Sequence, residues 1–345
     1  MKKKTLIISS LCACLFIIAS GCGDSTQITN PTSNKDKAIK LYTEDAGLTW
    51  EAHNIQGYEN IPGICSFSYD LSTFSIIVDT VMSTGYYGNT ILKTSDFGKS
   101  WNIIPLSPYT TKINDISNTF TDGKGFCIGR ANIGDHSAIN ITTDNGSSWS
   151  EIQNFTPSTN AKHHWALDFG DESSGIIIPE DPGDSTLITS DGGLTWISGT
   201  PITNDAYIND ISFLNSTIAV VCGNGGRIFR TTDAGSSWSQ ITSPTTEDLN
   251  SIDFKDQIGV IVGNYGTILR TTDGGLNWII GSVSSTSHLR KVYLSDLAYW
   301  ACGDNIIIRS YNIGNTWSVQ RNVTNEYYKD LFFIKNAGFV VGRSQ

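Results

Sequence analysis

The stretch Arg270-Thr271-Thr272-Asp273-Gly274-Gly275-Leu276-Asn277-Trp278 decides the fold, because its pattern recurs along most of the chain. Reduced to its recurring positions, the pattern is Ser/Thr-x-Asp-x-Gly-x-Ser/Thr-Trp, and seven copies can be read. The tryptophans that end successive copies lie between 39 and 51 residues apart. A repeat of about 40–50 residues is typical of a propeller or a solenoid. The acidic or amide residues at the centre of the copies are Asp45, Asp96, Asp144, Asp191, Asp233, Asp273 and Asn312.

Each copy has the residues of a tight turn between two strands. The carboxylate can accept hydrogen bonds from backbone N–H groups two or more residues further on, and the glycine supplies a positive φ. The tryptophan then begins the outgoing strand and carries a large apolar surface into the core. Because these aspartates occur once per repeat on equivalent turns, they cannot converge on one catalytic or metal site. We therefore expect them to be structural.

The repeated motif resembles the Asp-box of the BNR-repeat proteins. Its longer form, which begins at Gly263 and runs through Gly266 to Trp278, resembles the propellers of the photosystem II assembly (stability) factor family. The resemblance spans roughly residues 38–345 and implies a non-enzymatic assembly or binding scaffold. In that family a basic strip formed by the repeats contributes to partner binding, and four residues match its position just before the box: Lys93, Arg230, Arg270 and Arg309. Tyr42, Ile141 and Ile188 interrupt the series.

The composition between the boxes is typical of an all-β chain, with many Gly, Ser, Thr, Asn and Ile residues and no convincing helical period. Residues 38–53 supply two strands before the first complete repeat, and Tyr327–Gly342 supplies two more before the chain stops. Joining the two ends would remove exposed sheet edges. We therefore predict a seven-bladed β-propeller over residues 38–345, with four antiparallel strands per blade and one blade closed by the N- and C-terminal strands.

The first 37 residues have the features of an exported lipoprotein. Residues 1–21 combine three lysines, an apolar run and small residues, which predicts a signal peptide. Ala19-Ser20-Gly21-Cys22 resembles a bacterial lipobox, so we expect cleavage before Cys22, lipid on that cysteine and a flexible tether over residues 22–37. An ordinary secreted protein is the alternative. The prediction places the protein in the cell envelope, lipid-anchored, at the outer membrane or cell surface.

The charge balance limits the classes of partner, and the cysteines are best explained by a structural role. The chain has 23 Lys and Arg against 33 Asp and Glu, a net charge of −10, and it becomes more acidic once the three signal lysines are removed. This balance argues against nucleic-acid binding, which depends on Lys and Arg. The four cysteines of the predicted propeller, Cys65, Cys127, Cys222 and Cys302, fit small buried hydrophobes better than a disulfide framework or a zinc site.

Two further clusters are candidates for partner binding. His163, His164 and Trp165 precede a predicted inner strand and should face the central channel, and Tyr86 and Tyr87 form an aromatic loop. The first cluster fits a polar rim with one packed aromatic better than a ligand or metal site, and the second is equally compatible with an ordinary loop. We predict no catalytic residue, cofactor or metal, and a monomer that binds an envelope protein or glycan. The alternative is a sialidase-like or other glycoside hydrolase with its site at the channel mouth, which would require converging arginines and paired acids.

Overall fold

The structure is a computed structural model that describes residues 37–45, 47–54, 60–66, 74–79, 90–94, 102–106, 110–119, 123–131, 137–152, 164–203, 205–334 and 337–345. The predicted signal peptide, Cys22 and nearly all of the tether lie outside these residues, as do Tyr86, Tyr87, Asp96 and His163. The described part of the chain is all-β apart from two short 3-10 turns, at Asn224–Gly226 and Asn264–Gly266. None of its helices is long and apolar enough to cross a membrane.

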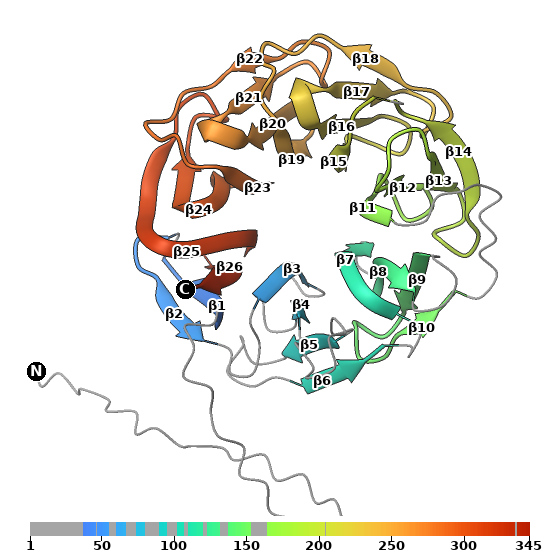
Figure 1. The fold of residues 1–345 in the computed structure, drawn as a ribbon, viewed down its shortest axis with the longest axis horizontal. Coiled ribbons are helices and arrows are strands. Elements are labelled where there is room, and N and C mark those ends of the chain that lie inside the picture. The colour runs from blue at the N-terminus through green and yellow to red at the C-terminus, as the bar shows by residue number, and fades with distance from the viewer. Residues whose placement is uncertain are drawn as a thin grey trace, which may run out of the picture. The chain divides into compact units, whose positions relative to one another are not determined.

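Residues 37–345 form a β-propeller, a ring of sheets around a central channel (Figure 1). Five sheets have four antiparallel strands each, with the first strand of each sheet innermost in the ring (Figure 1). Their strands are β3 (Asn60–Ser66), β4 (Phe74–Asp79), β5 (Thr90–Thr94) and β6 (Asn102–Pro105); β7 (Thr110–Thr119), β8 (Lys124–Ala131), β9 (Ser137–Thr142) and β10 (Ser150–Glu151); β11 (His164–Phe169), β12 (Gly175–Pro179), β13 (Ser185–Thr189) and β14 (Ile197–Pro201); β15 (Ile208–Phe213), β16 (Ala219–Gly223), β17 (Ile228–Thr231) and β18 (Ser239–Ile241); and β19 (Leu249–Lys255), β20 (Ile258–Gly263), β21 (Ile268–Thr271) and β22 (Ile279–Ile280).

The prediction of seven four-stranded blades is wrong. The structure has five such blades, and the remaining strands form one larger sheet of six strands in the order β2-β1-β26-β25-β24-β23. We call it the closing sheet. Its strands are β1 (Lys37–Thr43), β2 (Glu51–Asn54), β23 (Leu289–Leu294), β24 (Tyr299–Ser310), β25 (Ser318–Ile334) and β26 (Ala337–Ser344).

The closing sheet is continuous because each of two strands, β24 and β25, covers a length that the repeat pattern assigned to two separate strands. β24 runs on through Asp304 and Asn305, where the neighbouring blades have the longer turns Asn224–Gly226 and Asn264–Gly266. β25 runs along the rim of the ring and then bends toward the channel (Figure 1). At this bend Asn325 has a φ of 66°, and Arg321 donates to both carboxylate oxygens of Glu326 at 2.9 Å. These contacts hold one strand through a corner where a turn was expected.

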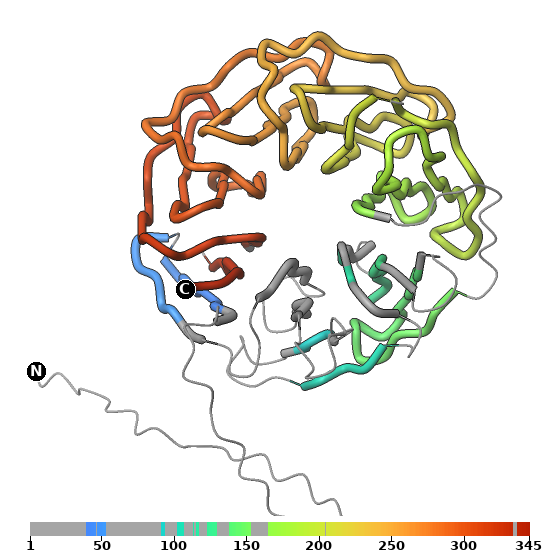
Figure 2. Tube along the Cα trace, viewed as in Figure 1, coloured from blue at the N-terminus to red at the C-terminus, as the bar shows by residue number. Residues whose placement is uncertain are grey.

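The two ends of the propeller meet in the closing sheet. β1 pairs antiparallel with β26 from Lys37 opposite Ser344 to Thr43 opposite Gly338. Figure 2 shows the same arrangement, with the blue N-terminal strand beside the dark red C-terminal one. The contact joins residues about 300 positions apart, so the ring is closed only by segments from opposite ends of the sequence.

The core lies between neighbouring sheets. In one cluster, Val220 and Cys222 of β16 pack with Leu249 and Ile252 of β19 and with Trp278, the tryptophan that ends one box. Trp278 is 6% exposed, and its indole N–H donates to the carbonyl of Gly275 at 3.2 Å. Burying an aromatic side chain of this size contributes about 2–3 kcal/mol. The recurring tryptophan therefore fills the gap between one sheet and the next.

Candidate binding site at the channel mouth

A bulge in six of the described inner strands aims side chains into the channel. At this bulge the register shifts across one residue, which is left without a partner across the sheet, and we call the residue before it, the unpaired residue and the residue after it the first, second and third residues. Strand β7 has one further shift, and β3 shifts between Asn60 and Gly63. Such a bulge bends the strand and redirects the side chains beside it. The third residues are Asp115, Ala166, Asp210, Ser251, Lys291 and Asp330, and the described second residues that line the pocket below are Trp165, Asn209, Asn250, Arg290 and Lys329.

The channel carboxylates hold neighbouring inner strands together. Four of them accept a hydrogen bond from a backbone N–H of the next sheet along the chain: Leu167 N to Asp115 Oδ2 (3.1 Å), Phe213 N to Asp168 Oδ2 (2.8 Å), Ile252 N to Asp210 Oδ2 (3.1 Å) and Leu294 N to Asp253 Oδ2 (2.7 Å). Serine hydroxyls accept such hydrogen bonds as well: Val292 N donates to Ser251 Oγ at 3.3 Å. An inner strand leaves these N–H groups without a sheet partner on that side, and the side chains satisfy them.

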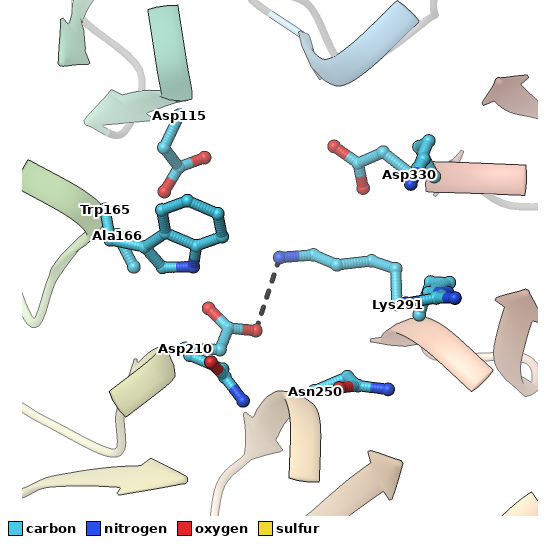
Figure 3. Close-up of a pocket in the computed structure, with 10 residues that line it drawn as sticks. Asp115, Trp165, Ala166, Asp210, Asn250, Lys291 and Asp330 are labelled. Atoms are coloured by element: carbon cyan, nitrogen blue, oxygen red, sulfur yellow. Dashed lines mark hydrogen bonds and ion pairs between the residues drawn. The ribbon is translucent and has the colours of Figure 1, made fainter. Parts of the chain in front are cut away.

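Lys291 is the cation at the centre of these carboxylates. Its ammonium group lies 3.4 Å from Asp210 Oδ2, and the carboxylates of Asp115 and Asp330 also face it (Figure 3). The Asp210 side chain is 11% exposed and additionally accepts from Ser251 Oγ at 2.7 Å. Lys291 thus balances part of the negative charge that the bulges gather at the third positions.

The pKa values of these groups follow from that setting. Burial raises the pKa of Asp115, Asp168 and Asp253 to about 7, against the lowering effect of the backbone N–H donors. Burial on its own would lower the pKa of Lys291, but the surrounding carboxylates, Asp210 first, raise it above its usual value. At neutral pH the site therefore holds a fully charged lysine and partly protonated acids.

One layer nearer the mouth, the second residues connect the inner strands to the turns around them. Asn250 donates to Asn264 Oδ1 at 3.0 Å and to the carbonyl of Leu289 at 2.7 Å, and Asn209 makes the equivalent pair of contacts. In the closing sheet, Arg290 replaces the asparagine and donates to both carboxylate oxygens of Asp304 at 3.1 and 2.9 Å. Lys329 is the next second residue along the ring.

Second and third residues together line a pocket of about 250 Å³. Its walls are acidic at Asp115 and Asp210 and basic at Arg290 and Lys329. The indole of Trp165, 39% exposed, lies at the side of the pocket between the Asp115 and Asp210 carboxylates (Figure 3). A pocket of this size accommodates one or two amino-acid side chains or the end of a chain.

The structure places the predicted candidates at different ends of the blades. Trp165 lines the pocket, whereas His164 is described only as the first residue of β11 and the remaining members of the two predicted clusters lie outside the described residues. The basic residues just before the boxes lie at the opposite end of the sheets, because strand directions alternate. Among them, Arg230 Nε donates to the carbonyl of Gly274 at 2.9 Å and Arg270 Nε to that of Ile313 at 3.0 Å.

These basic residues therefore contact the box of the next sheet. Lys93 Nζ donates to Ser147 Oγ at 2.6 Å in the same manner. Arg309 is 7% exposed, with its guanidinium carbon 4.4 Å from the ring centroid of Tyr311. The four residues are not gathered into one cluster, and their part in partner binding stays a prediction.

In the described Asp-boxes the central side chain closes its own turn. Ser237 N and Ser237 Oγ donate to the two oxygens of Asp233 at 2.9 and 2.6 Å, and Thr231 Oγ1 donates to Oδ1 at 2.7 Å. These hydrogen bonds lower the pKa of Asp233. The same network occurs at Asp45, Asp144, Asp191 and Asp273, and in amide form at Asn312.

Three of the four propeller cysteines, Cys127, Cys222 and Cys302, are buried free thiols, and the side chain of Cys65 is not described. Within the described ranges no group of three His, Cys, Asp or Glu residues is arranged to hold a metal ion.

The pocket residues of the closing sheet were not predicted from the sequence. A signal was present, because Arg290-Lys291 and Lys329-Asp330 place charges in the middle of inner strands that are otherwise apolar. Alignment of the inner strands alone, without reference to the boxes, would have shown those charges at matching positions.

Comparison with known proteins identifies the repeat. Residues 200–289 match the family described as Photosynthesis system II assembly factor YCF48. No curated protein matches the sequence. Among solved structures, YCF48 bound to D1 peptide is 18% identical, covers 90% of this chain and 95% of its own, and superposes with a TM-score of 0.62.

Other propellers are comparably similar in fold. Virginiamycin B lyase from Staphylococcus aureus is 14% identical, with 89% of this chain and 99% of that chain covered and a TM-score of 0.63. The GH74 xyloglucanase from Xanthomonas campestris is 12% identical over 85% of this chain but only 54% of its own, with a TM-score of 0.62. Identities this low establish the fold alone. The chain is thus a β-propeller whose repeat resembles that of the photosystem II assembly factor YCF48 family, as the sequence predicted.

Proposed function

We propose that the protein is a non-enzymatic binding scaffold that docks a protein partner on one end of its ring. We call this end the mouth face and define it by Trp165, Tyr207, Tyr265, Arg290 and Lys329. The single observation that carries the proposal is that the channel acids are already used to join the inner strands. A carboxylate that accepts backbone N–H groups in a fixed position is poorly placed to transfer protons to a substrate.

Exposed aromatic residues on the mouth face support binding. Tyr207 is 49% exposed just before β15, and Tyr265 is 63% exposed in the turn between β20 and β21. Tyr265 has a φ of 55°, which is unfavourable for a residue with a side chain, and its ring centroid lies 4.7 Å from that of His288. Exposed tyrosine and tryptophan beside arginine is the composition of many protein interfaces. The YCF48 structure similar to this chain contains a bound peptide.

Site-specific photo-crosslinking tests the proposal. A benzophenone amino acid is placed at Tyr265 on the mouth face or at Leu276 in the same blade, where the box turn presents an equally exposed side chain at the opposite end. Irradiation of intact cells should give a defined protein adduct from position 265 and none from 276. Adducts from position 276 alone would reverse the assignment of faces. If neither position gives adducts and the purified protein cleaves a glycoside substrate, the enzyme alternative would replace the scaffold.

The location of the scaffold is a second part of the proposal. We propose that Cys22 carries lipid and tethers the propeller to the cell envelope, as the lipobox-like sequence indicates. Substitution Cys22→Ser should move the protein from the membrane fraction to the soluble fraction without altering the melting temperature of the propeller. Retention of the variant in membranes would overturn the anchor.

A further inference from the structure

Lys329 stands out among the charged residues of the pocket. It is half-buried, and among the described residues it makes no hydrogen bond or close ion pair. Asp304 attracts it electrostatically but receives both hydrogen bonds from Arg290, and the Asp330 carboxylate faces Lys291 (Figure 3). A partly buried ammonium group without a hydrogen-bonded counterion is costly unless a ligand neutralises it.

The surroundings of Lys329 are basic. Arg290 is the second residue of the neighbouring inner strand, and Arg343, whose guanidinium carbon lies 4.9 Å from the Tyr327 ring centroid, pairs across β26 and β25 with Tyr327. Burial lowers the pKa of Lys329, Arg290 and Arg343 lower it further, and Asp304 opposes this lowering in part. Arg290 and Lys329 therefore line one wall of the pocket, and Arg343 adds a positive charge that acts on Lys329 from outside the pocket lining.

We propose that this wall binds a carboxylate of the docked partner, with Lys329 as the principal contact and Arg290 beside it. The inference rests on the proposed scaffold function and specifies what the mouth face recognises. A carboxylate supplies Lys329 with a hydrogen-bonded counterion and can accept charge-assisted hydrogen bonds from both residues. The pocket volume of about 250 Å³ suits a chain end or one acidic side chain. The carboxylate can come from a C-terminus or from an Asp or Glu residue.

NMR of the whole protein tests the contact without knowledge of the partner. Lysines are reductively methylated with ¹³C, which preserves their charge, and the Lys329 signal is assigned by its loss in Lys329→Gln. The probes are N-acetyl-trialanine with a free C-terminus, the same peptide amidated, and an amidated peptide with a central glutamate. At constant ionic strength the free acid, the glutamate peptide or both should shift the Lys329 signal saturably, and the neutral amide should not.

Lys255 is the matched control, because it pairs with Asp296 on the exposed surface. A comparison of the two acidic peptides identifies the source of the carboxylate. Lys329→Gln should weaken the effective peptide about tenfold, whereas Lys329→Arg should retain most of the binding. The proposal is wrong if no peptide shifts Lys329, or if Lys255 responds equally.

Crosslinking separates this inference from the scaffold proposal. If benzophenone at position 265 gives the same adduct yield in the Lys329→Gln background as in the parent, the scaffold stands and the carboxylate contact fails. If no adduct forms in the parent while the Lys329 signal still responds to carboxylate, the contact stands and the protein scaffold fails. The expected result is a clear loss of adduct in Lys329→Gln and its recovery in Lys329→Arg.

Discussion

The Asp-box turns and the inner strands both depend on aspartate, but they use it over different distances in the chain. The carboxylate of Asp233 in a box is bonded to residues within four positions, whereas that of Asp210 in the channel is bonded to Ile252, 42 positions away. The pKa of Asp233 is lowered, chiefly by hydrogen bonds from Ser237, and burial raises that of Asp168 to about 7. One residue type thus closes a local turn at one end of the blades and joins separate sheets in the channel.

The difference shows which contacts a repeat can encode. A box is complete within one copy of the sequence, so every copy can carry it. A channel contact needs two copies, and the residue at a given position can change if its neighbour across the sheet boundary changes with it. This freedom allows Lys291 to replace the aspartate or serine of other sheets. It also lets one sector of the channel become a binding site while the boxes stay uniform.

Truncation should break the longest-range contact and have the largest effect. Deletion of Tyr327–Gln345 removes β26 and the inner half of β25, so β1 loses its partner and the ring is left open. We expect no cooperative thermal transition by circular dichroism, since exposed strand edges also promote aggregation. Deletion of Gln345 alone is the control and should change little. A truncated protein with the melting temperature of the full chain would show that closure is dispensable.

Asp210→Ala tests the channel contacts. The change leaves Ile252 N and Ser251 Oγ without their acceptor and removes the carboxylate nearest to Lys291. We expect a loss of about 3 kcal/mol in the free energy of unfolding, measured by urea denaturation. Asp210→Asn, which keeps an acceptor oxygen, should lose clearly less. Equal losses in both variants would mean that the charge, and not the backbone contact, matters most.

Asp273→Ala tests the local contacts within an Asp-box turn. It leaves Leu276 N and Asn277 N, at 3.1 and 3.0 Å from Asp273 Oδ1, without that acceptor. These groups lie near solvent and water can partly replace the carboxylate, so we expect a loss of about 1–2 kcal/mol by the same measurement. Lys329 binding to carboxylate peptides should be unchanged. A loss larger than that of Asp210→Ala would reverse the ranking of local and long-range contacts.

The pH dependence of stability should distinguish the channel aspartates from the Asp-box aspartates. The pKa of Asp168 and Asp253 is about 7 in the folded protein and about 4 in an unfolded chain, so the cost of ionising them appears as pH rises between these values. The box acids Asp45 and Asp273 have a folded pKa of about 2, so their stabilisation is present above pH 4 and is lost as pH falls toward 2. Melting temperatures should therefore peak near pH 4–5.

Asp168→Asn is the variant that checks this assignment. An uncharged amide should flatten the fall in melting temperature between pH 5 and pH 8 and leave the acid limb below pH 4 unchanged. A steeper fall in the variant would contradict the raised pKa of Asp168.

The sequence was sufficient for every feature that one repeat contains. The spacing of the boxes predicted an all-β propeller with antiparallel strands, and the residues of each box account for its turn without reference to the rest of the molecule. Gly275 illustrates this, because its φ of 82° is a requirement of the turn and is met by glycine alone at little cost. The long repeat around Gly263–Trp278 also indicated the family that the chain resembles.

Only the tertiary structure decided how the repeats join. The number of blades was predicted wrongly because the count assumed a turn wherever a repeat boundary fell. At Asp304 a short connection instead keeps β24 continuous. Near Asn325 the Arg321–Glu326 contact keeps β25 continuous. The pocket was missed for a related reason: Lys291, Lys329 and Asp210 are distant in sequence and meet only through bulges in separate inner strands. Local turn chemistry is determined by neighbouring residues, whereas a channel site depends on which strands the closed ring brings together.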